Sequence, residues 1–306
     1  MRVLRAGHDP EEYMMVKRNG NTLRIAVQSN GRLTSYSLDL LRGIGLEFED
    51  HERRLFARCR NFDVELLFLR DDDVPEYVAD GVADLGIVGL NVIREQEADV
   101  ENLVPLGFGF CTLTLAVPNV SPASKPLDLA GLRIATTHPR SLSRFLVAEE
   151  IGAEIIELHG GAEIAPALDV ADAICDLVST GTTLRMHDLR RIGDVWDSQA
   201  WLIANRDLEA DPDRAALVKR LRVRLDGLLT ARRLKCVTLN APAEALPRIL
   251  EILPGMRSPT VIPLADTGMV AVHAAAQEEV FWEAMERLKE AGATEILVLP
   301  VEKVMR

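Results

Sequence analysis

The sequence predicts an α/β protein with two α/β lobes and a smaller C-terminal domain. Short β-rich runs alternate with helical patterns from residue 23 to residue 204, which is typical of mostly parallel sheets. The chain passes between the two halves of this region twice, first within residues 103–117 and again near residues 200–204. From residue 235 the order becomes β-α-β-β-α-β, which predicts a separate ferredoxin-like module.

The first lobe is expected to span residues 22–112, after a polar arm at residues 1–21, with a return segment at residues 198–226. Its first strand, LRIAV, ends at the polar sequence QSNGR, and a helical pattern follows. Acidic residues stand at the start of the next helix, where the helix dipole favours them. The expected elements are a strand at 23–27, a helix at 33–44, strands at 54–58 and 64–68, a helix from 70, and a strand at 84–89.

The second lobe is expected to span residues 113–197, and the C-terminal domain residues 227–306. Two lobes joined by two crossings enclose a cleft, which is a usual place for a ligand. The second lobe should contain strands at 132–136 and 154–158, helices at 140–151 and 163–168, and a strand at the start of 171–184. A strand at 200–204 returns to the first lobe, and a long amphipathic helix at 211–232 follows. The C-terminal domain should contain strands at 236–239, 260–264, 269–274 and 295–299, and helices at 243–252 and 278–291.

The composition excludes several classes of protein. A net charge of −12 and a pI near 5.1 argue against non-specific nucleic-acid binding, which needs a basic surface. The four cysteines are far apart and the histidines show no metal-ligand spacing, so we expect no structural zinc and no dedicated metal cage. There is no secretory signal and no apolar run long enough to cross a bilayer. We therefore expect a cytoplasmic protein with neither nucleic acid nor membrane as a partner.

The most informative motif is ADAICDLVSTGTTL at residues 171–184, which predicts a buried strand, a tight loop and a helix start. The loop at residues 179–183 offers hydroxyls and backbone N–H groups to an anion. The carboxylates of Asp172 and Asp176 precede it and can accept hydrogen bonds from sugar hydroxyls. Together these groups suit a phosphorylated ribose. The alternative is an ordinary helix cap with nothing bound.

Two other polar segments of the first lobe have both a functional and a structural interpretation. Gly31 and Arg32 follow the first strand and can meet an anion, although a turn glycine and a surface arginine also fit. Asp71, Asp72 and Asp73 are consecutive, so they cannot all face one metal ion from a helix start. For at least two of them we expect capping or solvation.

From residue 23 to its C-terminus, the chain resembles the long form of ATP phosphoribosyltransferase, the first enzyme of histidine biosynthesis. The motif at residues 171–184 is similar to the phosphoribosyl-pyrophosphate loop of that family. Further matches occur in the same order along the chain. They are Leu69-Arg70, Asp73, DLGIVG at 84–89, GGAEIAP at 160–166, SPTVIPL at 258–264 and ILVLP at 296–300.

The resemblance implies a core similar to periplasmic binding proteins and an ACT-like regulatory domain that binds histidine. It also implies Mg²⁺, a homodimer–homohexamer equilibrium, and transfer of the 5-phosphoribosyl group from phosphoribosyl pyrophosphate to N1 of ATP with release of pyrophosphate. The expected catalytic residues are Asp176, Asp172 and Glu163. Ser179, Thr180, Gly181, Thr182 and Thr183 are expected to bind phosphoribosyl pyrophosphate, and Arg32, Arg70 and Asp73 are expected to bind ATP. Asn240, Thr260, Ala275 and Glu295 correspond to the histidine site of relatives.

The chain departs from the family pattern at a few positions. The loop at residues 28–31 has no lysine where the family often has one, so the expectation is either that Arg32 takes a share of the phosphate charge or that ATP binding is weaker. Leu90 stands where a charged residue is usual, and Ala167 and Asp169 replace an arginine and a glycine of close relatives. Asn240 has an alternative role as the cap of the following helix.

Two other functions compete with the transferase. One is a two-lobed ligand-binding or sensor protein without chemistry, which has no need of a phosphoribosyl loop. The other is a non-catalytic regulatory paralogue, which should have a damaged loop. The loop at residues 179–183 is intact, and it therefore favours the enzyme.

Overall fold

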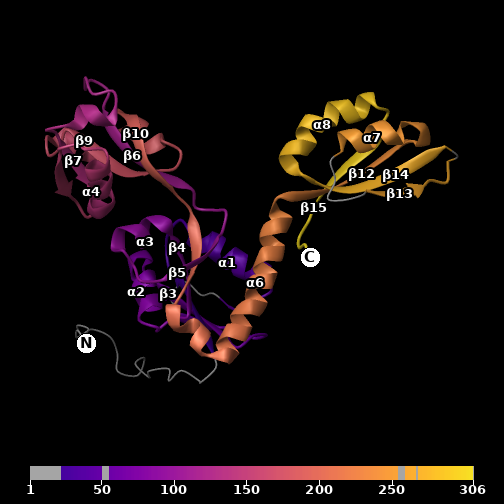
Figure 1. Cartoon of the computed structure of the whole chain (residues 1–306), viewed down its shortest axis with the longest axis horizontal. Helices are drawn as coiled ribbons and strands as arrows, with labels where there is room; N and C mark the ends of the chain where they lie inside the picture. The colour runs from indigo at the N-terminus through magenta and orange to yellow at the C-terminus, as the bar shows by residue number, and fades with distance from the viewer. Residues whose placement is uncertain (1–21, 50–54, 254–258, 267, 306) are drawn as a thin grey trace. The chain divides into compact units, whose positions relative to one another are not determined.

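A computed structural model describes residues 22–49, 55–253, 259–266 and 268–305 of the chain. The expected arm at residues 1–21 and Ser258 lie outside the described residues. The chain divides into two compact units: Met1–Arg42 with Leu46–Leu217, and Gly43–Gly45 with Val218–Arg306. The first unit contains two sheets and the second contains one (Figure 1). The division falls at Val218, whereas the sequence led us to expect it at residue 227.

The first sheet has the strand order β2-β3-β1-β4-β11-β5. Strands β3, β1 and β4 are parallel, whereas β2, β11 and β5 pair antiparallel with their neighbours. Figure 1 shows the strands standing between α1 on one side and α2 and α3 on the other. The bounds are β1 Leu23–Gln28, α1 Thr34–Gly43, β2 Phe56–Arg58, β3 Val64–Leu69, η1 Asp71–Asp73, α2 Val74–Ala79, β4 Leu85–Gly89, α3 Leu90–Gln96, β5 Glu101–Pro105 and β11 Ala200–Ala204.

The sequence explains why these strands are central. Every residue of β4 is buried, and so are most residues of β1, because helices cover both faces of a parallel sheet. On one face, Val74 and Val78 of α2 and Val92 of α3 pack in one cluster with Ala26 of β1 and Val88 of β4. This apolar cluster covers one face of the sheet. The carboxyl ends of the strands lie outside the cluster and remain available to the polar loops that follow.

The second sheet has the order β10-β6-β9-β7-β8. Strands β7, β8 and β9 are parallel, and β6 joins β9 and β10 antiparallel. Its largest apolar cluster includes Leu113 and Leu115 of β6, Ile134 of β7 and Leu142 of α4. The bounds are β6 Cys111–Pro118, η2 Pro126–Leu129, β7 Arg133–Thr136, α4 Pro139–Ala148, β8 Glu154–Glu157, η3 Ala162–Ile164, η4 Pro166–Leu168, β9 Ala173–Val178, α5 Thr182–Met186 and β10 Leu189–Ser198.

Strand β10 was missed at the level of sequence. Its sequence, LRRIGDVWDS, is rich in charge because it is an edge strand that buries little of its surface. Two register shifts interrupt its pairing with β6, between Arg191 and Gly193 and between Asp194 and Trp196. These irregularities break the alternation of apolar and polar residues that would have predicted a strand.

The two crossings between the lobes lie side by side. Leu106 N donates to Ala200 O, and Ala200 N donates to Phe108 O, each at 2.9 Å. One crossing connects β5 to β6, and the other connects β10 to β11 through Gln199. The expected two-lobed core, with a double connection, is therefore present. The pairing holds the carboxyl ends of both parallel sheets at a shared cleft.

The C-terminal domain has the sheet order β13-β14-β12-β15, with every pair antiparallel. Its core places Val237 and Leu239 of β12 against Ile249 of α7 and Leu288 of α8. This is the expected ferredoxin-like arrangement, and the predicted fold class is confirmed. The bounds are η5 Arg206–Ala210, α6 Pro212–Arg232, β12 Leu234–Pro242, η6 Ala243–Ala245, α7 Leu246–Ile252, β13 Thr260–Pro263, β14 Met269–Gln277, α8 Glu278–Glu290 and β15 Thr294–Pro300. Among the described residues, no helix is both long and apolar enough to cross a membrane.

Candidate active site

The loop between β9 and α5 presents its hydroxyl groups to solvent. Gly181 has a φ of +72°, a left-handed conformation that favours glycine, and it turns the chain into α5. The hydroxyls of Thr180 and Thr182 are 3.0 Å apart, and Arg185 Nη2 donates to Thr182 Oγ1 at 3.2 Å. Arg185 was missed in the sequence, although it lies only three residues beyond Thr182. Its guanidinium adds a positive charge to a loop that already offers hydroxyls and N–H groups.

Asp176 lies near the carboxyl end of β9. Burial raises the pKa of its carboxyl group, and the charge of Glu163 raises it further. The opposing effects come from the Leu177 N–H, which donates to Asp176 Oδ1 at 2.7 Å, and from the positive charges of His138 and Arg32. The charges of Glu163 and His138 of the second lobe and of Arg32 of the first lobe therefore all act on Asp176. The cleft therefore brings together three of the residues predicted from sequence.

Glu163 lies on the short helix η3, which follows a tight turn at Gly160 and Gly161. Gly161 has a φ of +67° and precedes η3, whose second residue is Glu163. The side chain of Glu163 is half-buried, whereas Gly160 and Gly161 are exposed. The two glycines let the chain reverse after β8, so that η3 packs near β9 and the charge of Glu163 acts on Asp176.

Arg32 is held at the mouth of the cleft by the loop after β1. Gln28 Oε1 accepts a hydrogen bond from Leu33 N at 3.1 Å, and a Cβ atom at Gly31 would overlap the Gln28 side chain. Gln28 thus shapes the loop in which the family often has a lysine. The Arg32 side chain is exposed, and its charge reaches Asp71, Cys111 and Asp176. Arg32 therefore faces groups of both lobes.

Asp71 lines the cavity between the lobes and is one of three consecutive aspartates, at least two of which were expected to serve capping or solvation. Its Oδ1 atom is buried and has no hydrogen-bond partner among the described residues. Burial raises the pKa of the Asp71 carboxyl to about 6, the neighbouring charge of Asp72 adds to this effect, and Arg32 opposes it. Its position directly after a buried parallel strand was the available signal. Asp72 is exposed, as expected for a solvated residue.

The other two residues expected to bind ATP stand on the same segment. Arg70 is exposed and precedes η1, and Asp73 precedes α2. The Asp73 side chain makes no capping hydrogen bond to α2, so capping does not account for this carboxylate. Both residues follow β3 at the carboxyl edge of the first sheet, the edge on which Arg32 also lies.

The structure separates Asp172 from the other predicted catalytic residues. Asp172 precedes β9, and Asp176 lies at the other end of the strand. Both carboxylate oxygens of Asp172 accept hydrogen bonds from the Arg133 side chain, and Oδ2 also accepts from Arg133 N at 2.9 Å. These bonds hold the pKa of the Asp172 carboxyl below its usual range. A carboxylate committed to Arg133 at the wrong edge of the sheet cannot contact the ribose, so we remove Asp172 from the catalytic set.

A cavity of about 830 Å³ opens between the lobes beside these residues. It is lined by Asp71 and Asn91 from the first lobe and by His138 and His159 from the second. Burial lowers the pKa of His138, while the carboxylates of Glu95, Asp176 and Asp72 oppose that effect. His138 was missed because a single histidine in the loop after β7 carries no spacing signal. The cavity thus combines carboxylates of the first lobe, such as Asp71 and Glu95, with His138, His159 and Arg140 of the second.

Comparison with known proteins decides the family. A family model described as ATP phosphoribosyltransferase matches residues 70–227, and one described as HisG, C-terminal domain, matches residues 231–303. A curated ATP phosphoribosyltransferase from Cytophaga hutchinsonii is 43% identical over 284 residues, which cover 93% of this chain and 99% of that protein. The chain belongs to the ATP phosphoribosyltransferase family.

Two solved structures are similar to parts of the chain. The ATP phosphoribosyl transferase (HisG:HisZ) complex from Thermotoga maritima is similar, with a TM-score of 0.57 and 25% identity, over 67% of this chain and 98% of that chain. A periplasmic sulfonate-binding protein from Methylobacillus flagellatus is similar over 66% of each chain, with a TM-score of 0.47 and 18% identity. The chain is thus a pentosyltransferase of histidine biosynthesis, as its motifs predicted. The non-catalytic alternatives find no support.

The departures from the ATP phosphoribosyltransferase pattern have local explanations. Asp169, in place of a glycine, has a φ of +54°, and its carboxylate accepts a hydrogen bond from Arg133 at 3.0 Å. The position therefore keeps the backbone conformation that a glycine would supply. Leu90 begins α3 and lines two neighbouring cavities with its apolar side chain. Ala167 is exposed, and nothing in the structure explains its replacement of an arginine.

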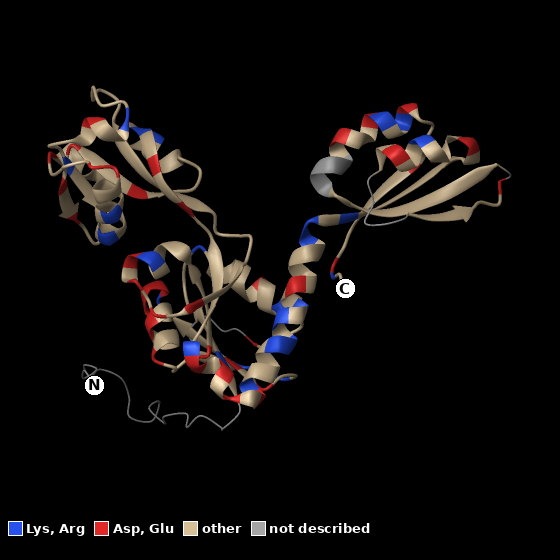
Figure 2. Cartoon of the chain, viewed as in Figure 1, with Lys and Arg blue, Asp and Glu red and all other residues tan. Residues whose placement is uncertain are grey.

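The residues expected to bind histidine lie on the face of the C-terminal sheet opposite α7 and α8. Asn240 Nδ2 donates to Glu295 Oε2, which ties β12 to β15. Thr260 pairs with His273, and Ala275 pairs with Cys236 two positions farther along β14. Figure 2 shows that the strands of this sheet carry few charged residues. The Asn240 side chain therefore bonds across the sheet rather than capping the helix that follows it.

Proposed function

We propose that the two lobes of this ATP phosphoribosyltransferase bind one substrate each. The second lobe supplies the loop at residues 179–183, with Arg185 beside it, for the 5-phosphate of phosphoribosyl pyrophosphate. Asp176 and Glu163 accept hydrogen bonds from the ribose hydroxyls. The first lobe supplies Arg32, Arg70 and Asp73 for ATP. The observation that carries this proposal is the cavity that residues of both lobes line, and the charge of Arg32 in the first lobe acts on Asp176 in the second.

The geometry suits displacement at the anomeric carbon of the ribose. N1 of the adenine forms a bond to C1, and the bond from C1 to the pyrophosphate oxygen breaks. The ribose carries positive charge during this exchange, and the carboxylates of Asp176 and Glu163 stabilise that charge. Burial strengthens the effect, because Asp176 is largely removed from water. Positioning of the two substrates can account for about 7–11 kcal/mol of the barrier, so the reaction needs no covalent nucleophile.

Mg²⁺ is the metal that the reaction implies. Asp176 and Glu163 are oxygen donors of the kind Mg²⁺ prefers, and their charges act on one another. Among the described residues, no group of three or more His, Cys, Asp and Glu has a metal-holding arrangement. These two carboxylates would therefore hold the ion together with substrate oxygens. When bound, Mg²⁺ neutralises charge on the departing pyrophosphate.

The chemistry is tested by incubating the protein with ATP, phosphoribosyl pyrophosphate and Mg²⁺. Product with the absorbance of an N1-substituted adenine should appear together with one equivalent of pyrophosphate. Thr183→Ala should raise the KM for phosphoribosyl pyrophosphate, because the variant loses one donor to a charged phosphate. Such a bond contributes on the order of 1.5–3 kcal/mol. No N1-substituted product from the intact protein would refute the assignment.

Regulation by histidine belongs to the same proposal. We place the histidine site at Asn240, Thr260, Ala275 and Glu295, supported by the contact between Asn240 and Glu295 on the uncovered face of the sheet. That face also exposes Leu297 and Leu299, which supports assembly through this domain into a homodimer and a homohexamer. All four cysteines are free thiols, which supports a reducing compartment and hence the cytoplasm.

A further inference from the structure

Helix α4 begins without a cap from its own lobe. Its preceding residue, His138, makes no capping hydrogen bond with its side chain, and Pro139 is the first helical residue. The next two N–H groups, of Arg140 and Ser141, have no carbonyl partner within the helix at this end. A side-chain oxygen normally accepts hydrogen bonds from these two positions.

Glu95 of the first lobe supplies that cap. Its Oε1 accepts a hydrogen bond from Arg140 N at 2.8 Å, and its Oε2 accepts one from Ser141 N at 2.9 Å. Both oxygens of the carboxylate are therefore used at the positive end of a helix in the other lobe. Glu95 belongs to α3, which packs on the first sheet through Val92. The bond pair thus connects α3 rigidly to α4 across the cleft.

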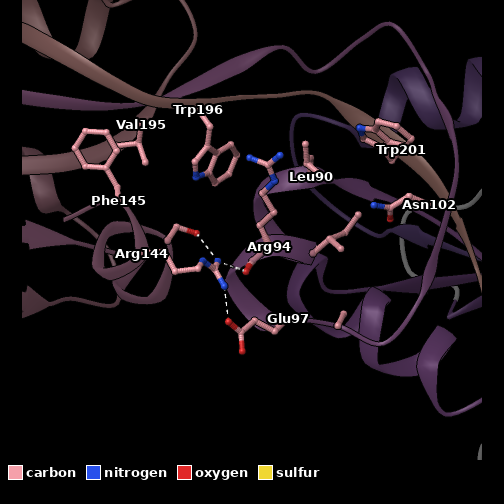
Figure 3. A pocket seen from close by; sticks show the side chains of 12 residues that line it. Leu90, Arg94, Glu97, Asn102, Arg144, Phe145, Val195, Trp196 and Trp201 are labelled. Atoms are coloured by element: carbon pink, nitrogen blue, oxygen red, sulfur yellow. Dashed lines mark hydrogen bonds and ion pairs between the residues drawn. The ribbon is translucent and has the colours of Figure 1, made fainter. Parts of the chain in front are cut away.

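Further hydrogen bonds join α3 and α4 next to the Glu95 cap. Arg140 Nη1 donates to Gln96 O at 3.3 Å. Figure 3 shows Arg144 reaching from α4 to the Glu97 carboxylate and to Arg94 O. Arg144 and Glu97 are both exposed, so their pair is worth little in water. The capping bonds are better shielded from water than this ion pair, because Ser141 is only 2% exposed and the Glu95 side chain is partly buried.

The contact lies at the wall of the active cleft. Glu95, His138 and Arg140 all line the cavity of about 830 Å³ between the lobes. Every residue that we assign to phosphoribosyl pyrophosphate belongs to the second lobe, and every residue that we assign to ATP belongs to the first. The relative placement of the lobes therefore decides whether N1 of ATP meets C1 of the ribose.

We propose that Glu95 is a positioning residue that holds the two lobes in the reactive arrangement by capping α4 across the cleft. Both of its carboxylate oxygens are bonded to α4, so it acts through α4 and the loop that carries His138. This inference rests on the proposed division of the substrates between the lobes. Positioning of this kind affects the chemical step and ATP binding but spares phosphoribosyl pyrophosphate, which needs the second lobe alone.

The experiment compares Glu95→Ala, Glu95→Gln and the matched variant Glu97→Ala. Glu95→Ala should lower kcat at least tenfold and raise the KM for ATP, while the Kd for phosphoribosyl pyrophosphate stays within twofold. Glu95→Gln keeps one carbonyl acceptor and should recover part of the loss. Glu97→Ala removes an acidic residue of the same helix contact without touching the cap, and it should change kcat by less than twofold.

A second readout does not depend on turnover. Hydrogen exchange of the Arg140 and Ser141 amides should be faster in Glu95→Ala and unchanged in Glu97→Ala, with similar melting temperatures. Normal kcat in Glu95→Ala despite faster exchange would overturn the positioning role. Weaker binding of phosphoribosyl pyrophosphate in Glu95→Ala would also overturn it. Such a result would mean that Glu95 is needed for the folding of the second lobe itself and not only for its placement. Failure of the proposed function itself would appear separately, as absence of product from the unaltered protein.

Discussion

Asp84 and Arg214 form an ion pair of 2.7 Å in which the carboxylate is almost completely buried. The other oxygen of Asp84 accepts a hydrogen bond from Arg24 N at 2.8 Å, so one side chain joins β1 to the first turn of α6. Arg214 is held in turn by Asp211 at 2.7 Å. Asp84 begins the DLGIVG motif that supported the family resemblance, but the structure gives it an architectural role.

Removing Asp84 should therefore destabilise the first lobe. Asp84→Ala removes the buried acceptor of Arg24 N and one of the two carboxylates that pair with Arg214, while Asp211 still holds the guanidinium. Loss of a hydrogen bond to a charged group costs about 1.5–3 kcal/mol. Denaturant unfolding measures this loss. Asp99→Ala, which breaks the exposed pair with Arg206, is the control and should cost less than about 1 kcal/mol. Equal losses of unfolding free energy in the two variants would contradict a stabilising role for the buried Asp84–Arg214 pair.

Asp71 should make the stability of the protein depend on pH. Its carboxyl has a pKa of about 6, above its ordinary value of 3.8, because it is buried. The unfolded chain therefore ionises this group first, and stability falls as the pH rises from about 4 to about 6. Asp71→Asn removes the effect and should be more stable above pH 7. The difference of about two pKa units corresponds to at most about 3 kcal/mol.

The measurement is urea unfolding of Asp71→Asn and the unaltered protein at several pH values. The advantage of the variant should shrink as the pH falls below about 6 and should vanish near pH 4, where the native carboxyl is protonated. A variant that is less stable than the unaltered protein at pH 8 would show that the Asp71 carboxylate has a stabilising partner.

Asp172 and Asp176 offer a matched test on one strand. Asp176→Asn should lower kcat/KM at least tenfold and change the melting temperature little, because this carboxylate faces the cleft. Asp172→Asn should leave kcat nearly normal but lower stability, because it weakens the bonds to Arg133. The Asp172 carboxyl has a lowered pKa, so its stabilising effect is present at neutral pH and lost on acidification. The reverse pattern of activity and stability would invalidate our assignment.

Sequence reasoning located most of the fold because its signals are local. Buried runs such as residues 23–28 and 85–89 read directly as parallel strands. The site was harder, because its geometry depends on contacts far apart in the chain. Asp172 and Asp176 look equivalent in the sequence, but only Asp176 lies at the cleft end of β9. Glu95 could not be found, because its partners Arg140 and Ser141 are 45 and 46 residues away.

Turnover should require Mg²⁺, which arrives largely with the substrates. Excess EDTA should abolish product formation, and added Mg²⁺ should restore it. The melting temperature of the substrate-free protein should not change with EDTA, because Asp176 and Glu163 alone offer too few ligands to hold the ion tightly. A stoichiometric metal in substrate-free protein, with a lower melting temperature after chelation, would contradict this expectation.

Histidine should inhibit the enzyme from the C-terminal domain. The catalytic residues assigned above all precede residue 187, so histidine need not touch the substrates. Inhibition then requires that histidine bind an inactive state more tightly, with a coupling of about 1–3 kcal/mol that also weakens histidine binding when substrates are present. Asn240→Ala removes the contact with Glu295 and should lower histidine affinity at least tenfold without changing uninhibited kcat. Calorimetric titration of histidine and inhibition curves measure both effects, with Thr238→Ala on the same strand face as control. Undiminished histidine affinity in Asn240→Ala would place the site elsewhere.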